Sequence, residues 1–254
     1  MHPGIDVCQS FGFVQSDTCL PERGGKAPTR FEKALDGGNM IIAIDGPAGA
    51  GKSTVAKRVS EILGFMFIDT GAIYRAVTYS LIRDEIDLDN RESLENYLKN
   101  IDLKYTSEHI YFRGTVIDSE IREEAISKKT SDYSKNPVIR SFATDFQRKL
   151  AKNNNVVMEG RDIGTVVFPE ADHKFFLTAS HDVRGRRRYE ELKKSDKDIT
   201  LEKTIEAIRL RDKNDSSREL APLKKAADAV EIDTSHIGID EVIETIIGYV
   251  RMED

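Results

Sequence analysis

The stretch IDGPAGAGKST, residues 44–54, constrains the fold of this chain more than any other part of its sequence. Within it, residues 46–53 match the pattern G-x-x-x-x-G-K-[ST] at every fixed position. An apolar run rich in isoleucine, residues 39–46, overlaps the start of the pattern and predicts a buried strand. Residues 53–63 follow with helical spacing of their apolar side chains, and Gly64 ends that helix. This order of strand, loop and helix predicts a phosphate-binding loop for a nucleoside triphosphate.

The residue types in this loop each suit phosphate binding. Glycines let successive backbone N–H groups turn toward phosphate oxygens, and the start of the following helix adds its positive end. We expect Lys52 to reach the β and γ phosphates of ATP and the Ser53 hydroxyl to contact Mg²⁺. The predicted ATP-binding residues are Gly46, Pro47, Ala48, Gly49, Ala50, Gly51, Lys52, Ser53 and Thr54. The loop leaves the phosphoryl acceptor open, because water would make the chain an NTPase and a small molecule would make it a kinase.

The rest of the chain alternates predicted strands and helices. Further strands are expected over 65–69, 155–159, 173–179 and 229–235, and further helices over 71–85, 91–100, 137–151, 181–196, 200–215 and 240–254. This alternation predicts an α/β, three-layer P-loop fold with a parallel central sheet flanked by helices. Residues 101–117 alternate like an antiparallel hairpin instead, which predicts a small inserted subdomain with an antiparallel sheet.

These patterns also divide the chain into segments. We predict a core kinase domain from residues 39–84 and 137–254, interrupted by an insertion over 85–136. Residues 1–38 have no helical or strand period and are rich in Gly and Pro, so a disordered leader or an upstream start-site extension without chemistry is expected there. A transit peptide or a regulatory arm is the alternative.

The composition limits which partners the protein can bind and which cellular compartment suits it. The net charge of −6 argues against nucleic acid or an anionic membrane surface as the main partner. No apolar run approaches the roughly 18 residues that a membrane span needs. The two cysteines, Cys8 and Cys19, lie close together near the start, so no disulfide framework is expected and the prediction is a cytoplasmic protein. The five histidines have no ligand spacing, so no structural zinc is expected.

The motifs of GTPases and motor ATPases are missing from the sequence. The base-reading N-K-x-D motif is absent, and no predicted strand offers a convincing D-x-x-G switch. The segment VVMEG, residues 156–160, has a single acid and runs directly into Arg161 and Asp162, whereas a motor ATPase should show Asp-Glu. These absences favour a kinase.

Arginines at predicted strand ends and helix starts favour a second phosphate site. They are Arg75, Arg140, Arg161, Arg184, Arg187, Arg188, Arg211 and Arg218. Guanidinium groups bind phosphate oxygens in pairs and stay charged, and phosphoryl transfer between two anions needs such cations. Each cluster alone also fits a structural interpretation, namely a charged helix face, a tight turn or a capped helix end. Their presence together beside a complete phosphate loop favours phosphate clamps.

The chain resembles the bacterial cytidylate kinases, a branch of the nucleoside monophosphate kinases. The resemblance rests on IDGPAGAGKST, DTGAIYRA, GRDIGTVVFPEADHKFFLTAS, RLRDKNDSSRELAPLKKAADAVEIDTS and the insertion before Arg140. It runs from about Met40 to the C-terminus, and the first 38 residues have no counterpart in the family pattern. The resemblance implies a core domain, a monophosphate-binding insertion and a helical lid at about residues 182–197.

The resemblance also implies roles for individual residues. Thr70, Tyr74 and Arg75 would lie at the monophosphate site, with Arg75 and Arg161 on its phosphate. Ser131, Arg140 and Asp162 would read the cytosine ring, in which a carboxylate suits the exocyclic amine while Arg and Ser suit the ring acceptors. Arg211 and Asp215 would contact the ribose, and Arg218 would bind phosphate. Arg184, Arg187 and Arg188 would close over the transferring group. The predicted catalytic residues are Lys52, Arg161, Arg184 and Arg188.

From the sequence we therefore predict a monomeric enzyme that phosphorylates CMP and dCMP with ATP and Mg²⁺ by direct in-line transfer. One alternative is a kinase of UMP, dTMP or AMP on the same scaffold. A second alternative is a nucleotide-dependent switch that hydrolyses ATP or GTP slowly, which leaves the arginines without a role.

Overall fold

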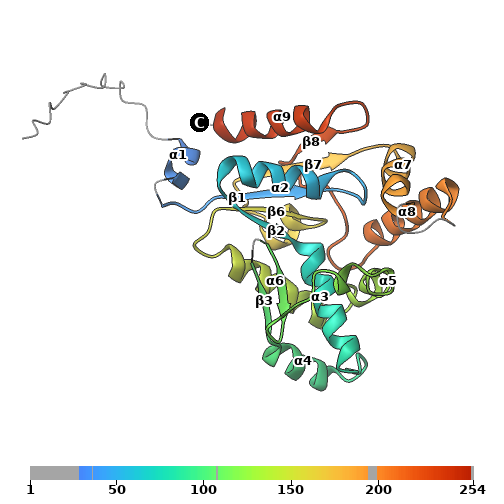
Figure 1. Cartoon of the computed structure of the whole chain (residues 1–254). Coiled ribbons are helices and arrows are strands. Elements are labelled where there is room, and N and C mark those ends of the chain that lie inside the picture. Colours follow the sequence, from blue (N-terminus) through green and yellow to red (C-terminus); the bar gives the residue numbers. More distant parts are fainter. Residues whose placement is uncertain (1–28, 36, 107, 194–198, 253–254) are drawn as a thin grey trace, which may run out of the picture.

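The computed structural model describes residues 29–35, 37–106, 108–193 and 199–252 (Figure 1). In chain order the elements are α1 (Arg30–Leu35), β1 (Ile41–Asp45), α2 (Lys52–Leu63), β2 (Met66–Asp69), α3 (Thr70–Arg83), α4 (Arg91–Asn100), β3 (Leu103–Tyr105), β4 (Ile110–Phe112), β5 (Thr115–Val116), η1 (Glu120–Arg122), α5 (Glu124–Tyr133), α6 (Pro137–Ala151), β6 (Val156–Gly160), η2 (Ile163–Val167), β7 (His173–Thr178), α7 (His181–Leu192), α8 (Leu201–Ser216), β8 (Val230–Asp233) and α9 (Ile239–Met252). Within the described ranges, none of the helices has both the length and the apolar character that crossing a membrane requires.

The central sheet is parallel, as the alternation of strands and helices predicts. Its strand order is β2-β6-β1-β7-β8, and each neighbouring pair is parallel. Asp45, the last residue of β1, is in register with Gly160 of β6 and Phe176 of β7. The carboxyl ends of these strands therefore lie at one edge of the sheet. This edge collects the loop after β1 and the Arg161–Asp162 pair after β6.

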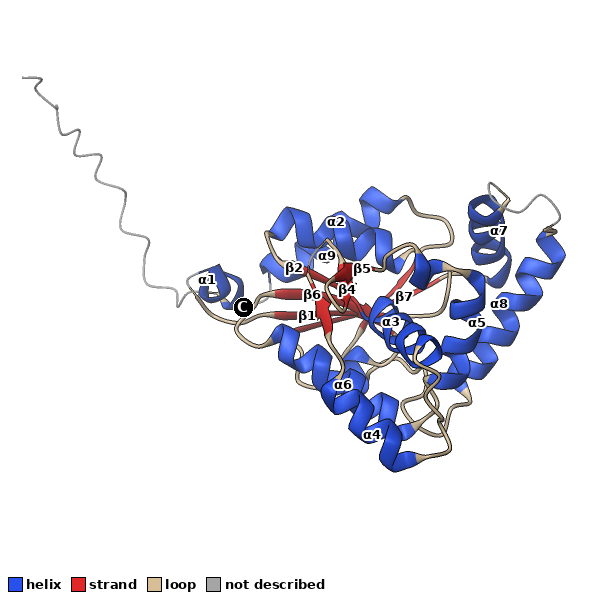
Figure 2. Cartoon of the chain, turned by 60° about the horizontal axis from the view of Figure 1, so that its bottom comes forward, coloured by secondary structure: helices blue, strands red, loops and turns tan. Residues whose placement is uncertain are grey.

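Helices cover both faces of the sheet and give the predicted three layers (Figures 1 and 2). On one face, α2 and α9 bury side chains such as Val59 and Ile246 against Ile44 of β1. On the other face, α3 and α6 bury Ile73 and Ala151 in a core that also contains residues of β6. Both faces of the strands are thus apolar, which explains why the sequence shows continuous apolar runs instead of alternation.

The inserted segment forms a second, three-stranded antiparallel sheet, β3-β4-β5. Its Ile110 and Phe112 pack with Ala76 of α3 in one cluster. The turn between β4 and β5 has positive φ at both Arg113 (50°) and Gly114 (73°), which matches a two-residue hairpin turn. The small sheet is therefore built on α3, the helix that also carries Tyr74 and Arg75.

Helices α7 and α8 pack on each other beside the carboxyl edge of the central sheet (Figure 2). Gly185 makes this close packing possible, because a Cβ at that position would lie 2.3 Å from Cγ1 of Ile205. The predicted helix over 181–196 ends at Leu192, and residues 194–198 lie outside the described residues.

The prediction of a structureless leader is wrong for residues 30–35, which form the helix α1. Phe31 packs near Phe65, with ring centroids 6.4 Å apart, and Ala34 is buried. Arg30 forms an ion pair with Asp172. A helix of less than two turns is too short to show periodicity, so the sequence pattern could not reveal it. Residues 1–28 lie outside the described residues.

The insertion also contains more helix than the sequence analysis predicts. A short 3₁₀ turn, η1, and the helix α5 follow the three strands. In α5, Ile126 is the buried residue, so the helix has no apolar stripe that would predict it. Residues 163–167, next to the predicted GRDIG turn, form a π-helical turn.

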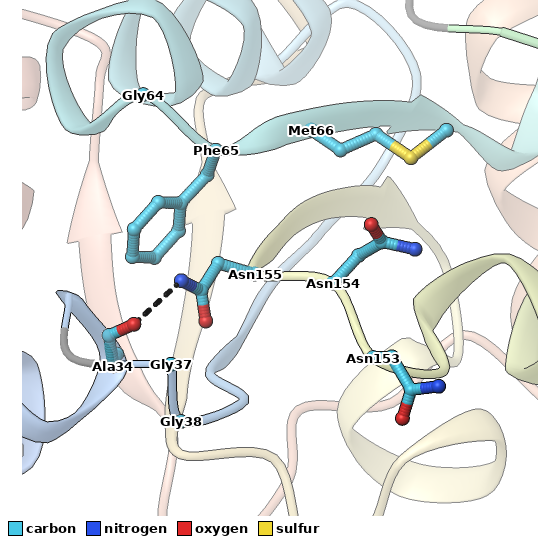
Figure 3. Close-up of a pocket in the computed structure, with 9 residues that line it drawn as sticks. All are labelled: Ala34, Gly37, Gly38, Gly64, Phe65, Met66, Asn153, Asn154 and Asn155. Atoms are coloured by element: carbon cyan, nitrogen blue, oxygen red, sulfur yellow. Dashed lines mark hydrogen bonds between the residues drawn. The ribbon is translucent and has the colours of Figure 1, made fainter.

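A polar pocket lies at the end of the sheet where β1, β2 and β6 begin, opposite the phosphate-binding loop, and Figure 3 shows the residues that line it. Its lining residues are Ala34, Gly37, Gly38, Gly64, Phe65, Met66, Asn153, Asn154 and Asn155. The Asn155 side chain donates a hydrogen bond to the Ala34 carbonyl at 3.0 Å and accepts one from the Met40 N–H at 2.8 Å. Asn155 thus ties α1 and the residue before β1 to the start of β6.

Candidate active site

The phosphate-binding loop connects β1 to α2 at the carboxyl edge of the sheet. Gly46 has φ of 147°, and a Cβ there would lie 2.0 Å from the Leu177 carbonyl oxygen, so only glycine fits. Gly51, also with positive φ, stands at the N-cap of α2. The loop therefore presents the N-terminal end of α2, with its unpaired N–H groups and positive end, to any bound phosphate.

Lys52 lies buried in this loop. Its Nζ donates a hydrogen bond to the Pro47 carbonyl at 2.8 Å. Burial, and then repulsion from Arg161, lower the pKa of Lys52 to about 7, while Glu159 opposes the shift. A nearby phosphate would supply the missing negative charge and favour the protonated lysine. Lys52 is thus placed to respond to an anionic ligand.

Ser53 and Glu159 bring two hard oxygen ligands together. The Ser53 hydroxyl donates a hydrogen bond to Oε1 of Glu159, the penultimate residue of β6. Burial, and then the charge of Asp69, raise the pKa of Glu159. A hydroxyl, a buried carboxylate and adjacent phosphates suit Mg²⁺, which keeps several waters and uses few protein ligands. The described residues contain no cluster of three or more His, Cys, Asp or Glu side chains that could hold a metal alone.

Asp45 joins the phosphate-binding strand to the loop that carries Arg161. Its two carboxylate oxygens accept hydrogen bonds from the N–H groups of Ile163 and Gly164, at 2.9 and 2.8 Å. Burial raises the pKa of Asp45 to about 6, against the lowering effect of these two hydrogen bonds. The geometry of the GRDIG segment therefore depends on a carboxylate at the end of β1.

Three residues hold the start of α3 at the same edge. Asp69 caps α3 by accepting a hydrogen bond from the Ala72 N–H, and it pairs with Nη2 of Arg75 at 3.1 Å. The Thr70 hydroxyl donates to the Glu159 carbonyl at 2.7 Å. The Asp69 N–H donates to the hydroxyl of Tyr105, on β3 of the insertion, at 2.8 Å. Arg75 is thus oriented by Asp69, and Asp69 by the small sheet.

A buried ion pair connects α6 to the loop after β6. Nη2 of Arg140 lies 2.5 Å from Oδ2 of Asp162, and each side chain is 7% exposed. Nη1 of Arg140 donates to the Ser134 carbonyl at 3.3 Å, and the guanidinium lies 5.5 Å from the centre of the Tyr74 ring. The Ser134 hydroxyl donates to the carbonyl of Ser131, which is half-buried near the end of α5. The predicted base-reading residues are therefore linked through Ser134.

The remaining acceptor-side arginines gather around Asp215 of α8. Nε of Arg161 donates to Oδ2 of Asp215 at 3.0 Å, and Nε of Arg218 donates to the Asp215 carbonyl at 3.3 Å. Arg211 lies one helical turn before Asp215 on the same face of α8, and its side chain extends to the surface. Partial desolvation of its guanidinium, and then repulsion from Arg161, lower the pKa of Arg211 to about 10. A concentration of positive charge is therefore present where a phosphate is expected.

The three predicted lid arginines of α7 have different surroundings. The Arg184 side chain is 3% exposed, donates hydrogen bonds to two backbone carbonyls and forms an ion pair with Asp212. Arg187 donates to the hydroxyl and carbonyl of Thr234, at 3.0 and 2.6 Å. Arg188 is half exposed and pairs with Glu191 at 2.9 Å. Of the three, Arg188 is the one whose guanidinium is free to reach a bound nucleotide without breaking buried contacts.

Several buried polar atoms at this edge have no hydrogen-bond partner within the described residues. They include the Tyr74 hydroxyl, Nε of Arg75 and Nη2 of Arg218. Buried polar atoms without partners are uncommon in folded proteins and point to a ligand or water. All three belong to residues that the sequence analysis assigns to substrate binding.

Sequence reasoning missed Asp45, Asp69, Tyr105, Glu159 and Asp212. For Asp69 and Glu159 a signal was present, because each ends a predicted strand at the edge where the phosphate-binding loop lies. Glu159 was considered only as the acid of a motor ATPase. Tyr105 and Asp212 had no signal, because their partners are distant in the sequence.

The fold and the site together define a P-loop kinase: a parallel sheet, a complete phosphate-binding loop and a second cluster of cations facing it. The model of the family described as cytidylate kinase matches residues 42–252. The chain belongs to the cytidylate kinase family.

The sequence is also similar to individual cytidylate kinases. A cytidylate kinase of Clostridioides difficile is 46% identical over 85% of this chain and all of its own length. One of Halalkalibacterium halodurans is 48% identical over 84% of this chain and 97% of its own. Among solved structures, an uncharacterised protein of Eubacterium ventriosum matches with a TM-score of 0.50 and 15% identity, over 85% of this chain and all of its own, which concerns the fold alone.

Proposed function

We propose that this protein transfers the γ-phosphoryl group of ATP to CMP and dCMP, forming CDP and dCDP. The observation that carries the proposal is the second cation cluster, in which Arg75 and Arg218 each have a buried guanidinium nitrogen without a hydrogen-bond partner and Arg161 lies close enough to lower the pKa of Arg218. A phosphate bound there would face the phosphate-binding loop, as transfer between two nucleotides requires.

The chain's own residues supply charge and position for this transfer. An oxygen of the CMP phosphate attacks the γ-phosphorus of ATP while the bond from that phosphorus to the β–γ bridging oxygen breaks, leaving ADP. Lys52 neutralises charge on the β and γ phosphates, and Arg161 and Arg188 neutralise charge on the group in transfer. Ser53 and Glu159 would hold Mg²⁺, which when bound supplies further positive charge to the phosphates.

The base is recognised by the buried pair of Arg140, on α6, and Asp162, in the loop after β6. Asp162 accepts a hydrogen bond from the exocyclic amine of cytosine, and Arg140 and Ser131 serve its ring acceptors. Uracil and thymine present a carbonyl where cytosine has the amine, so the Asp162 carboxylate would be left facing an acceptor. This opposition favours cytosine over the other pyrimidines.

We also propose segmental roles. Residues 85–136 hold the monophosphate, since β3 supports Asp69 through Tyr105 and α5 carries Ser131. Helix α7 carries Arg188 toward the transferring group and excludes water with α8, because open water would compete with CMP for the phosphoryl group.

A coupled assay that measures ADP formation with CMP, dCMP, UMP, dTMP or AMP as the acceptor tests the proposal. We expect turnover with CMP and dCMP roughly five- to 150-fold above turnover with the other three, since one mismatched buried hydrogen bond costs about 1–3 kcal/mol. A preference for UMP, dTMP or AMP would refute the substrate assignment. ADP formation that ignores every monophosphate would refute the kinase assignment and favour an NTPase.

A further inference from the structure

Arg184 is held in place by hydrogen bonds from its buried side chain. Its Nε donates to the Ala179 carbonyl at 2.8 Å, and its Nη1 donates to the Ala48 carbonyl at 2.9 Å. Ala48 lies inside the phosphate-binding loop, two residues after Gly46. Arg184 therefore connects the first turn of α7 to the loop that would hold ATP. A side chain that is 3% exposed and bonded in this way would have to break these contacts to reach a phosphate.

Asp212 of α8 completes this connection. Its Oδ2 lies 2.6 Å from Nη1 of Arg184, and its side chain is 12% exposed. Neither carboxylate oxygen accepts a hydrogen bond from the described part of the chain, and Nε2 of His181 lies 3.5 Å from Oδ2. A mostly buried carboxylate without hydrogen bonds is costly unless a cation compensates it. Arg184 is the nearest such cation.

The position of Asp212 on α8 connects the acceptor side of the site with the side that would bind ATP. Asp215, one helical turn later, holds Arg161 at 3.0 Å on the acceptor side. Asp212 holds Arg184, which holds the Ala48 carbonyl on the donor side. One turn of α8 thus contacts Arg161 on the acceptor side directly and the phosphate-binding loop through Arg184.

We infer that Asp212 is a positioning residue: by fixing Arg184, it holds the phosphate-binding loop in its binding conformation and joins that loop to the acceptor helix α8. The connection to the acceptor helix rests on the proposed function. The effect on the phosphate-binding loop rests only on the contacts of Arg184 with Asp212 and Ala48. Arg184 acts through the Ala48 carbonyl in this scheme and not by contact with the phosphoryl group.

The test measures ATP binding by titration calorimetry without any acceptor, so it does not depend on which monophosphate is used. The variant is Asp212→Asn, which keeps the shape of the side chain and removes its charge. The matched control is Glu190→Gln, which removes a carboxylate from the exposed Glu190–Lys193 pair on α7, away from the loop. We expect Asp212→Asn to weaken ATP binding about tenfold and the control to bind ATP within twofold of the unaltered chain.

Two further variants separate positioning from loss of fold. Asp212→Glu retains the charge, and we expect it to recover ATP affinity to within about threefold. Arg184→Met alone should weaken ATP binding about tenfold, and the Arg184→Met/Asp212→Asn double variant should be no weaker than about tenfold, because the two residues act as one unit. ATP binding within twofold of normal in Asp212→Asn, or a double variant weakened about a hundredfold, would overturn the inference. Failure of the proposed function would instead show as an unaltered chain that binds ATP but does not phosphorylate CMP.

Discussion

The buried Arg140–Asp162 pair allows stability and substrate recognition to be separated. Replacing Asp162 with Ala leaves the Arg140 guanidinium buried, with the Ser134 carbonyl and the Tyr74 ring as its remaining contacts. Breaking one side of a buried ion pair costs about 3–5 kcal/mol of unfolding free energy, because the remaining charge is uncompensated. In a chain of this size, about 1 kcal/mol shifts Tm by about 2–4 °C, so we expect a loss of roughly 6–20 °C.

The assays are urea denaturation, which gives the unfolding free energy, and thermal denaturation, which gives Tm; both are followed by circular dichroism, and ATP binding is measured on the same preparations. The matched control is Asp132→Asn, which disrupts the exposed Lys135–Asp132 pair and should cost less than about 1 kcal/mol. The Arg140→Met/Asp162→Leu double variant removes both charges, so it should regain most of the lost stability. Neither Asp162→Ala nor the double variant should phosphorylate CMP, although both should still bind ATP.

Two results would refute this reasoning. A loss below about 1 kcal/mol in Asp162→Ala would show that the pair does not act as a buried charge pair. Phosphorylation of CMP by the double variant at close to the normal rate would show that the pair does not read the base. The raised pKa of Asp162, caused mainly by burial and opposed by Arg140, is consistent with a carboxylate that depends on its partner.

Three other substitutions test Asp45, the proposed Mg²⁺ site and helix α1. Burial raises the pKa of Asp45 to about 6, so the stability that Asp45 contributes is full below about pH 4 and is lost as the pH rises through 6. The difference in unfolding free energy between the normal chain and Asp45→Asn should therefore fall by about 3 kcal/mol over this window. A difference that does not change with pH in urea denaturation would contradict this. Glu159→Gln should raise the Mg²⁺ concentration needed for half-maximal turnover by about 10–100-fold, and an unchanged Mg²⁺ titration would remove Glu159 from the metal site. Phe31→Ala should lower the unfolding free energy by about 1–2 kcal/mol. Its kcat should be unchanged, because α1 packs far from the phosphate-binding loop. Unaltered stability would show that α1 does not support the core.

The central sheet could be predicted from the sequence because its evidence is local. Strands such as β1, β2 and β6 are short apolar runs that end at a polar residue or glycine. Many helices also have their own period or cap, as Asn90 shows for α4. The order of strands across the sheet has no such local signal. It depends on packing between elements far apart in the sequence, such as β1 against β6.

Helices that bury little were missed for the same reason. Helix α5 buries Ile126 alone, and α1 is shorter than two turns, so neither has an apolar stripe. Their positions are decided by tertiary contacts, such as that between Phe31 and Phe65.

In the site, residues with motif spacing could be predicted and residues that orient them could not. Arg75, Arg161 and Asp162 lie in motifs, whereas Tyr105 and Asp212 act through partners that only the fold brings near. Charge alone also did not distinguish the arginines of α7. Arg184 and Arg188 look alike in the sequence, yet one is buried in contacts with the phosphate-binding loop and the other is half exposed.

The most direct test of the central claim follows the γ-phosphoryl group itself. A single turnover of ATP labelled in its γ-phosphate, with CMP and Mg²⁺ present, is stopped and the labelled products are separated. We expect nearly all transferred label in CDP, because the cation cluster around Arg161 would place the CMP phosphate in line and water would be excluded. Label found mainly in inorganic phosphate would contradict it.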